Sequence, residues 1–254
     1  MANVTPIKKE THQSIKIAAK RDLSHAEKQH IAPITASEYT QAATSYPIVI
    51  VKDQGTERYR SVVMLGLEAG ENLYHKKEAW NAVYIPQSLS MAPFSLGVDP
   101  EKEKTLTACV DLDNPFVGED KEHELFDAEG KDSEFFKGVQ DSLGRLYDSE
   151  VVNEKFIKEL VDNDLLLELE LNISFISGET KKLVGLYNID EKKVQELSDD
   201  KVLDFHKRGL FIPIHAMLGS VGQVNRLAQL RNQSESPIKV NAIRFAPVAT
   251  ETKK

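Results

Sequence analysis

The stretch LLLELELNISF, residues 165–175, constrains the fold more than any other part of the chain. Apolar residues occupy alternate positions from 167 to 175, and polar residues such as Glu168 and Glu170 stand between them. Side chains of a strand point alternately to its two faces, so the pattern predicts a strand with one buried and one solvated face. The turn SGET and the segment KKLVGLYNI follow, which predicts an antiparallel hairpin over residues 165–188.

A second hairpin is predicted over residues 47–67. Its first strand, YPIVIVKD, contains four consecutive β-branched residues, which suit a pleated sheet; QGTE forms the turn and YRSVVMLGL the return strand. Apolar residues at helical spacing predict helices over 133–162, in two successive segments, and over 210–232. The expected fold class is α+β: a mixed, largely antiparallel sheet covered by helices, in a single domain.

The expected α+β domain covers residues 32–246. Residues 1–31 are polar and weakly periodic and are interpreted as an N-terminal arm, and residues 247–254 as a disordered tail. The motif TASE has the capping-box pattern of Thr35 and Glu38, which predicts a short helix at the start of the domain. The segments AWNAVYIP and TLTACVDL predict further strands.

Charge and hydropathy exclude some classes of function. The formal net charge of −8 argues against binding driven by neutralisation of nucleic-acid phosphates, so no nucleic-acid partner is expected. No apolar run approaches the 18 or so residues that a membrane span requires. The N-terminal segment has no apolar core typical of a secretion signal, and we therefore expect a cytoplasmic protein.

Few residues have the spacing of a metal or catalytic site. The acidic stretch 111–134 holds ten carboxylates in 24 residues, but Pro115 and Phe116 occupy the fifth and sixth positions of a calcium loop, so a solvated loop is expected. Only His25 and Glu27 have the His-x-Glu spacing of an iron site. The single cysteine, Cys109, lies in an apolar run and is expected to be buried. No metal and no cofactor are therefore predicted.

The aromatic stretch 71–97 holds the only tryptophan of the chain and is the best candidate for a binding site. Trp80 and Tyr84 are expected on one side of a strand that Pro86 ends, since prolines cannot donate to a ladder. Two interpretations remain open: the rings line a pocket for a planar or peptidic ligand, or they fill the core. The candidate binding residues are Glu71, Asn72, Tyr74, Trp80, Tyr84 and Phe94.

Several segments, taken in order, resemble the SapC family of Gram-negative bacterial proteins: YPIVI, GLEAGENLY, AWNAVYIPQSL, PFSLG, LFDAEG, LVGLYNIDEKKVQEL and GLFIPIHAMLGSVGQVNRL. The resemblance extends from about residue 25 to residue 232. It implies an accessory or binding protein that acts on a cell-surface protein or its peptide, either an S-layer protein or a TonB-dependent receptor. It brings no catalytic motif.

The alternative function is a peptide-modifying enzyme or oxygenase component whose metal ligands are dispersed along the chain. The histidines that would supply such ligands are His75, His123, His206 and His215.

Overall fold

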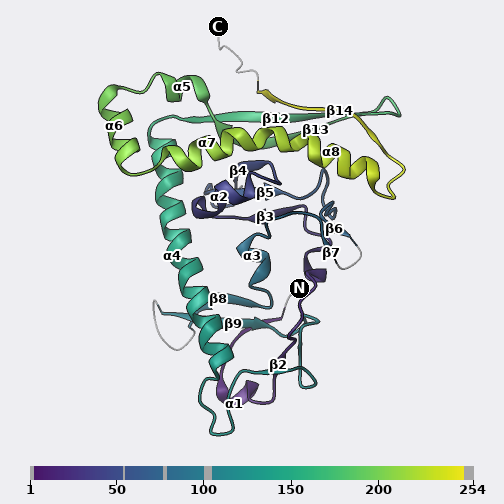
Figure 1. Ribbon diagram of the computed structural model, residues 1–254, viewed down its shortest axis with the longest axis vertical. Coiled ribbons are helices and arrows are strands. Elements are labelled where there is room, and N and C mark those ends of the chain that lie inside the picture. The colour runs from purple at the N-terminus through teal and green to yellow at the C-terminus, as the bar shows by residue number, and fades with distance from the viewer. Residues whose placement is uncertain (1–2, 54, 77–78, 100–104, 249–254) are drawn as a thin grey trace. The chain divides into compact units, whose positions relative to one another are not determined.

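The largest sheet has six strands in the order β14-β12-β13-β4-β5-β3 (Figure 1). The structure, a computed structural model, describes residues 3–53, 55–76, 79–99 and 105–248. β12 pairs antiparallel with β13, and β4 with β5, so both predicted hairpins are confirmed. The strands of this sheet are β3 Ile31–Pro33, β4 Ile48–Lys52, β5 Tyr59–Met64, β12 Leu166–Phe175, β13 Thr180–Ile189 and β14 Val240–Pro247.

Apolar and polar residues alternate along β12, and for this reason one face of the strand packs into the core. Leu169, Leu171 and Ile173 are buried, whereas Glu168 is exposed. α7 packs on β13 and β4, and α8 packs on β14, so the apolar face of the sheet is covered (Figure 1). The hydroxyl oxygen of Ser220, at the end of α7, accepts a hydrogen bond of 2.9 Å from the Ile48 N–H and ties that helix to β4.

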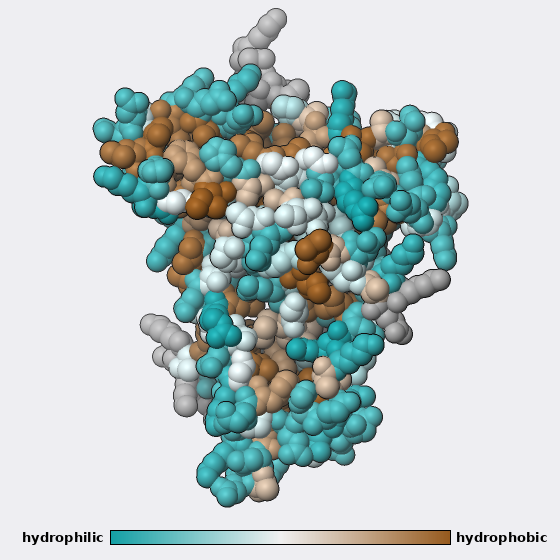
Figure 2. All heavy atoms as spheres, viewed as in Figure 1, coloured by the Kyte–Doolittle hydropathy of each residue, from teal (hydrophilic) through white to brown (hydrophobic). Residues whose placement is uncertain are grey.

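The single helix predicted over residues 210–232 is divided in the structure into α7, the short 3-10 helix η3 and α8. The side chain of Asp190 accepts hydrogen bonds from two backbone N–H groups of α5, and Gly209, with φ of +70°, follows α6. Some apolar residues remain on the surface around α7 (Figure 2); Ile212, for example, is 64% exposed. These elements are η2 Ala36–Glu38, α2 Tyr39–Ala42, α5 Glu191–Gln195, α6 Asp199–Lys207, α7 Phe211–Ser220, η3 Val221–Gln223 and α8 Val224–Gln233.

Two smaller sheets belong to a different part of the chain, in the orders β1-β9-β8 and β10-β2-β11. The predicted strand in TLTACVDL is β9, and Cys109 within it is buried, as expected. The remaining elements are β1 Val4–Pro6, α1 Lys9–His12, β2 Lys16–Ile17, η1 Ser24–Ala26, β6 His75–Lys76, β7 Ala79–Trp80, α3 Gln87–Ser90, β8 Phe94–Val98, β9 Leu106–Asp111, β10 Val117–Gly118, β11 His123–Glu124 and α4 Glu134–Asp162.

Contacts divide the chain into two compact units. Unit one comprises residues 1–27, 77–79 and 87–148, and unit two comprises residues 28–76, 80–86 and 149–254. The single helix α4 replaces the two successive segments predicted over 133–162, and it contributes residues to both units. The α+β class is confirmed, while the boundaries at residues 31 and 246 remain predictions. Of the predicted tail, residues 249–254 lie outside the described residues.

The strand predicted in AWNAVYIP is wrong beyond its first two residues. β7 ends at Trp80, and residues 81–86 form no strand. The backbone there bonds to turns and side chains instead: the Asn81 N–H donates to the Tyr74 carbonyl over 2.7 Å, and the Tyr84 carbonyl accepts from two side chains. The residue types of this segment are therefore a poor guide to a strand, because a turn and two side chains, and no neighbouring strand, satisfy this backbone.

Candidate aromatic pocket

Two of the predicted site residues, Tyr74 and Trp80, line one pocket of unit two with a volume of about 430 Å³. The Tyr74 ring is fully buried and the Trp80 ring is half-buried, so the indole presents part of its surface to the pocket. The two rings stack with centroids 6.2 Å apart and an interplanar angle of 25°. The other lining residues are Thr44, Ser45, Asn81, Ala82, Val83, Gln223 and Arg226.

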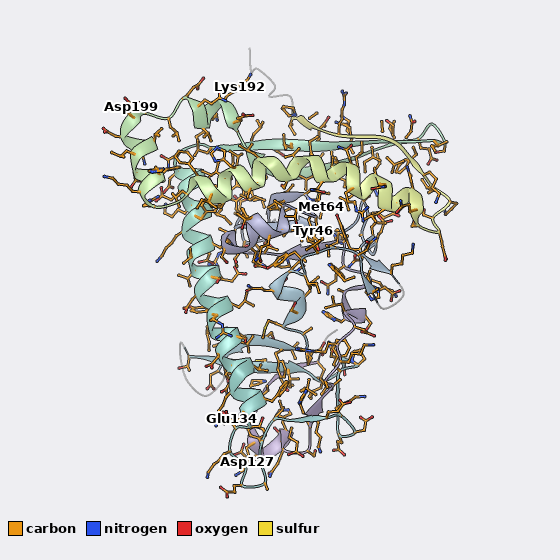
Figure 3. All side chains as sticks on the ribbon, in the orientation of Figure 1. Tyr46, Met64, Asp127, Glu134, Lys192 and Asp199 are labelled. Carbon is orange, nitrogen blue, oxygen red and sulfur yellow. The ribbon has the colours of Figure 1, made fainter. Side chains whose placement is uncertain are left out.

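Hydrogen bonds fix the Trp80 indole in place. Its Nε1–H donates to the Tyr46 hydroxyl over 2.6 Å and to the Tyr84 carbonyl over 3.2 Å. Tyr46, labelled in Figure 3, is fully buried and donates its own hydroxyl proton to the same carbonyl. Burial raises the pKa of Tyr46 and of Tyr74, which keeps both phenols protonated as donors. The indole is therefore bonded through its N–H and remains half-buried at the pocket.

Tyr84 does not share the pocket. Its hydroxyl donates to Oε1 of Glu38 over 2.7 Å, and Tyr84 contributes only its carbonyl to the indole. Burial and the hydrogen bond to Glu38 both raise the pKa of Tyr84. The expectation that Trp80 and Tyr84 lie on one side of a strand is wrong, because no strand connects them.

Glu71 and Asn72 do not line the pocket, but their side chains hold the backbone on either side of them in place. Glu71 forms an ion pair with Arg231, and its Oε2 accepts a hydrogen bond of 2.9 Å from the Leu67 N–H. A Cβ atom at Gly66 would overlap the Glu71 carbonyl, so this close approach requires glycine. Oδ1 of Asn72 accepts from the N–H groups of Tyr74 and His75 at 3.0 and 3.1 Å, which holds the turn before Tyr74.

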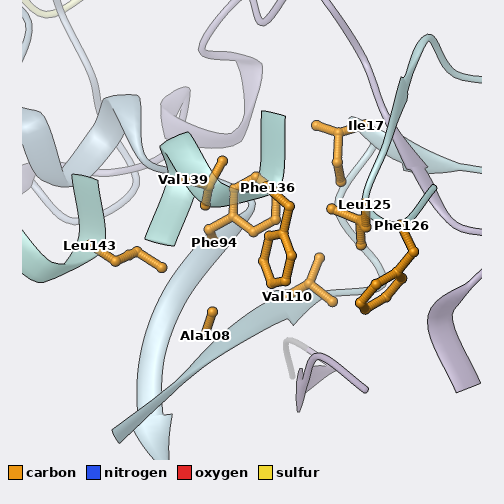
Figure 4. Close-up of a cluster of buried hydrophobic side chains, with 9 residues drawn as sticks. All are labelled: Ile17, Phe94, Ala108, Val110, Leu125, Phe126, Phe136, Val139 and Leu143. Atoms are coloured by element: carbon orange, nitrogen blue, oxygen red, sulfur yellow. The ribbon is translucent and has the colours of Figure 1, made fainter. Parts of the chain in front are cut away.

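Phe94, the sixth candidate, belongs to unit one, whereas the other five belong to unit two. It is 5% exposed and belongs to the buried apolar cluster of unit one (Figure 4). That cluster consists of Ile17, Phe94, Ala108, Val110, Leu125, Phe126, Phe136, Val139 and Leu143. Phe94 is a core residue of unit one, so the core interpretation applies to it; Trp80 lines a pocket, and ligand binding there remains a prediction.

Arg226 is the pocket residue that sequence patterns did not indicate. Its Nη2 donates to Oδ1 of Asn81 over 3.3 Å and its Nη1 to Oε1 of Gln229 over 3.1 Å. Among the described residues, no carboxylate pairs with this guanidinium. Asn81 and Arg226 are 145 positions apart, and only the packing of α8 brings them together. The pocket therefore joins an aromatic surface to a cation that hydrogen-bonds two neutral amides, those of Asn81 and Gln229.

The histidines do not assemble a metal site in the part of the chain that the structure describes. No group of three His, Cys, Asp or Glu side chains there has an arrangement that could hold a metal ion. His123 stacks on Phe135 with centroids 4.5 Å apart, and Nδ1 of His215 bonds the Phe211 carbonyl over 2.8 Å. Both rings thus have local packing partners.

The fold and the pocket define an α+β protein with a surface pocket of aromatic rings and one arginine. No helix in the described ranges is both long and apolar enough to cross a lipid bilayer. The sequence model of the family described as SapC matches residues 7–227, and the chain belongs to the SapC family. No curated protein and no solved structure gives a match.

Replacing Trp80 with Phe is expected to lower the free energy of unfolding by about 1–2 kcal/mol, because both hydrogen bonds of Nε1 disappear. Urea titration monitored by circular dichroism measures this loss, because the variant has no tryptophan whose fluorescence could report unfolding. Tyr147→Phe is the control, since the Tyr147 ring is 47% exposed in unit one and should be neutral. Equal midpoints for wild type and Trp80→Phe would contradict the structural role of the indole N–H.

Proposed function

We propose that this SapC-family protein is an accessory protein that binds a peptide segment of a protein client in the Trp80 pocket. The observation that carries the proposal is the half-buried Trp80 ring, held in place by two hydrogen bonds, beside the Arg226 guanidinium, which pairs with no carboxylate of the described ranges. An aromatic face and an unpaired cation together suit a ligand that offers an apolar side chain and a carboxylate.

The rim of the pocket supports the same ligand class. The Val83 side chain is 95% exposed, so a bound peptide would remove this apolar surface from water. Thr44, Ser45 and Gln223 add small polar groups that can bond a peptide backbone. The Gln223 amide, immediately before α8, already donates to the carbonyls of Ala43 and Thr44, at 3.2 Å each. These two hydrogen bonds connect the start of α8 to the loop after α2.

Membership of the SapC family supports a proposal for the class of client. We propose a cell-surface protein, either an S-layer protein or an outer-membrane receptor, whose acidic or C-terminal segment is bound in the cytoplasm before export. Fractionation of the native cells, followed by immunodetection and by affinity capture from the cytoplasmic fraction, tests the compartment and the client.

The binding test uses a library of short peptides that vary in acidic and aromatic residues, with free or amidated C-termini. Trp80 emission reports binding directly, because the chain has one tryptophan. Acidic peptides with an apolar side chain should bind best, and added salt should weaken them. Arg226→Gln should weaken binding at least about tenfold, or about 1.4 kcal/mol.

Arg145→Gln serves as the matched control, because Arg145 is exposed on the part of α4 in unit one. Its affinity for the same peptides should equal that of the wild type. If no peptide changes Trp80 emission, or if Arg226→Gln binds as tightly as the wild type, the proposal is wrong.

A further inference from the structure

A second pocket of unit two lies at β5 and the C-terminal half of α4, and its volume is about 310 Å³. This volume is at the small end of the range for small-molecule sites, roughly 300–1,000 Å³. None of its lining residues belongs to the Trp80 pocket. The six that carry its chemistry are Arg58, Arg60, Ser61, Glu150, Asn153 and Glu154.

The floor of this second pocket holds a buried amide with free donors. Asn153 is only 4% exposed, and its Oδ1 accepts from the Ala36 N–H over 3.1 Å and from the Ser61 hydroxyl over 3.3 Å. The Ala36 N–H can only donate, which fixes the amide orientation. The Tyr39 hydroxyl donates to Ser61, so the Ser61 proton is directed at Asn153. Nδ2 of Asn153 has no acceptor among the described residues and remains available to a ligand.

Charges of both signs surround this amide without ion pairs. Four charged side chains line this pocket, and none of them forms an ion pair with any described residue: Arg58, Arg60, Glu150 and Glu154. Glu150 and Glu154 are four residues apart on α4, so they share a helix face and repel each other. Burial raises the pKa of Glu150, the charges of Glu38 and Glu154 raise it further, and the charge of Arg60 partly opposes them. The pocket thus presents two carboxylates and two guanidinium groups that form no ion pair with the part of the chain that the structure describes.

We propose that this second pocket binds a zwitterionic small molecule of the α-amino acid class. Its ammonium group lies between Glu150 and Glu154, and its carboxylate accepts from Nδ2 of Asn153 and from Arg60. Ile34 and Ile157, which are 2% and 5% exposed, add an apolar floor, so an aliphatic side chain fits best. This site is independent of the peptide-binding function proposed for the Trp80 pocket.

The test measures binding of the free L-amino acids by calorimetry and thermal shift at up to about 10 mM, where even weak small-ligand affinities are detected. L-Leucine is the first probe. 3-Methylbutylamine, which lacks the carboxylate, and N-acetyl-L-leucine, which lacks the ammonium group, should each bind at least about tenfold more weakly. The proposal is overturned if no amino acid binds, or if either analogue binds as tightly as the amino acid.

Variants separate binding from folding. Glu150→Gln should weaken amino-acid binding at least about tenfold. It should not lower the melting temperature at pH 7: a carboxyl group with a raised pKa in the folded state destabilises the fold when ionised, and the amide removes that charge. Arg60→Gln should reduce the preference for leucine over 3-methylbutylamine, and the remaining preference reflects the Asn153 amide. Lys155→Gln, exposed on the same helix and outside this pocket, is the matched control.

The same titration on Arg226→Gln distinguishes this inference from the proposed function. The amino-acid affinity of that variant should equal that of the wild type, whatever happens to peptide binding. A Glu150→Gln protein that is folded and binds leucine with wild-type affinity would show that this pocket is not the site.

Discussion

Replacing Arg231 with Met is expected to lower the free energy of unfolding by about 3–5 kcal/mol, the range for breaking a buried ion pair by removing one partner. Arg231 is 4% exposed, and its guanidinium bonds Glu71, Glu68 over 2.8 Å and the Ile238 carbonyl over 3.2 Å. The Glu71 side chain is only 14% exposed, so the substitution leaves a poorly solvated carboxylate without its cation. Urea denaturation at pH 7 measures the loss.

The pH dependence tests the electrostatic origin of this effect. The hydrogen bond from Arg231 lowers the pKa of Glu68 below its ordinary value of 4.5, against the opposing effect of burial. A carboxylate with a lowered pKa stabilises the folded state above its unfolded-state pKa, and this contribution disappears as the pH falls through the folded-state pKa. The stability gap between wild type and Arg231→Met should therefore narrow below a pH of about 4.5. A gap that stays constant to pH 3 would indicate lost packing instead.

Arg226→Met is the matched control, because it makes the same substitution on the same helix, α8, at an arginine that forms no ion pair with the described residues. Its cost should stay below about 1 kcal/mol, as for a surface residue. Equal losses for Arg226→Met and Arg231→Met would show that the ion pair contributes nothing specific.

Replacing Glu38 with Ala is expected to lower the free energy of unfolding by about 3–5 kcal/mol. Glu38 is 1% exposed, and its carboxylate accepts from the Tyr84 hydroxyl over 2.7 Å and from the N–H and hydroxyl of Thr35 over 2.9 and 3.1 Å. Each buried donor left without an acceptor costs about 1–3 kcal/mol, and the capping box is lost as well. Thermal and urea unfolding monitored at Trp80 measure the change, since Tyr84 also positions that ring.

Glu38→Gln is the matched control for Glu38→Ala. Glutamine keeps a side-chain oxygen at the third helical position, where a capping box accepts either residue, so its cost should be about 1 kcal/mol. If Glu38→Ala is no worse than Glu38→Gln, the three hydrogen bonds to the carboxylate do not stabilise the protein.

The hairpins could be predicted because their signals are local. In β12 the alternation of leucine with polar residues specifies which side chains face the core, and in β4 four β-branched residues favour an extended backbone. The capping box of Thr35 and Glu38 also involves residues only three positions apart, and the structure confirms it. The aromatic segment gave a false strand, since its backbone bonds to Tyr46 and Trp80 side chains and not to a neighbouring strand.

The candidate sites could be predicted only in part, for the same reason. Trp80 and Tyr74 were marked by their residue types, but Arg226 joins them through α8, and Phe94 belongs to the core of unit one. Glu71 was predicted to be a binding residue because of its residue type and position, but in the structure it is the partner of Arg231, 160 positions away. Glu150, Asn153 and Arg60 showed no pattern at all, since a helix and a strand distant in sequence form their pocket.

The sequence by itself determined the α+β class, the two main hairpins, the helical character of residues 134–162 and 211–233, and membership of the SapC family, which rest on periodicity or on an ordered set of short segments. Only the tertiary structure decided which charges are paired. Arg231 is buried with two carboxylates, while Arg226, five residues earlier on the same helix, pairs with no carboxylate in the part of the chain that the structure describes. Burial and ion pairing depend on distances between residues far apart in the chain, and no local spacing encodes those distances.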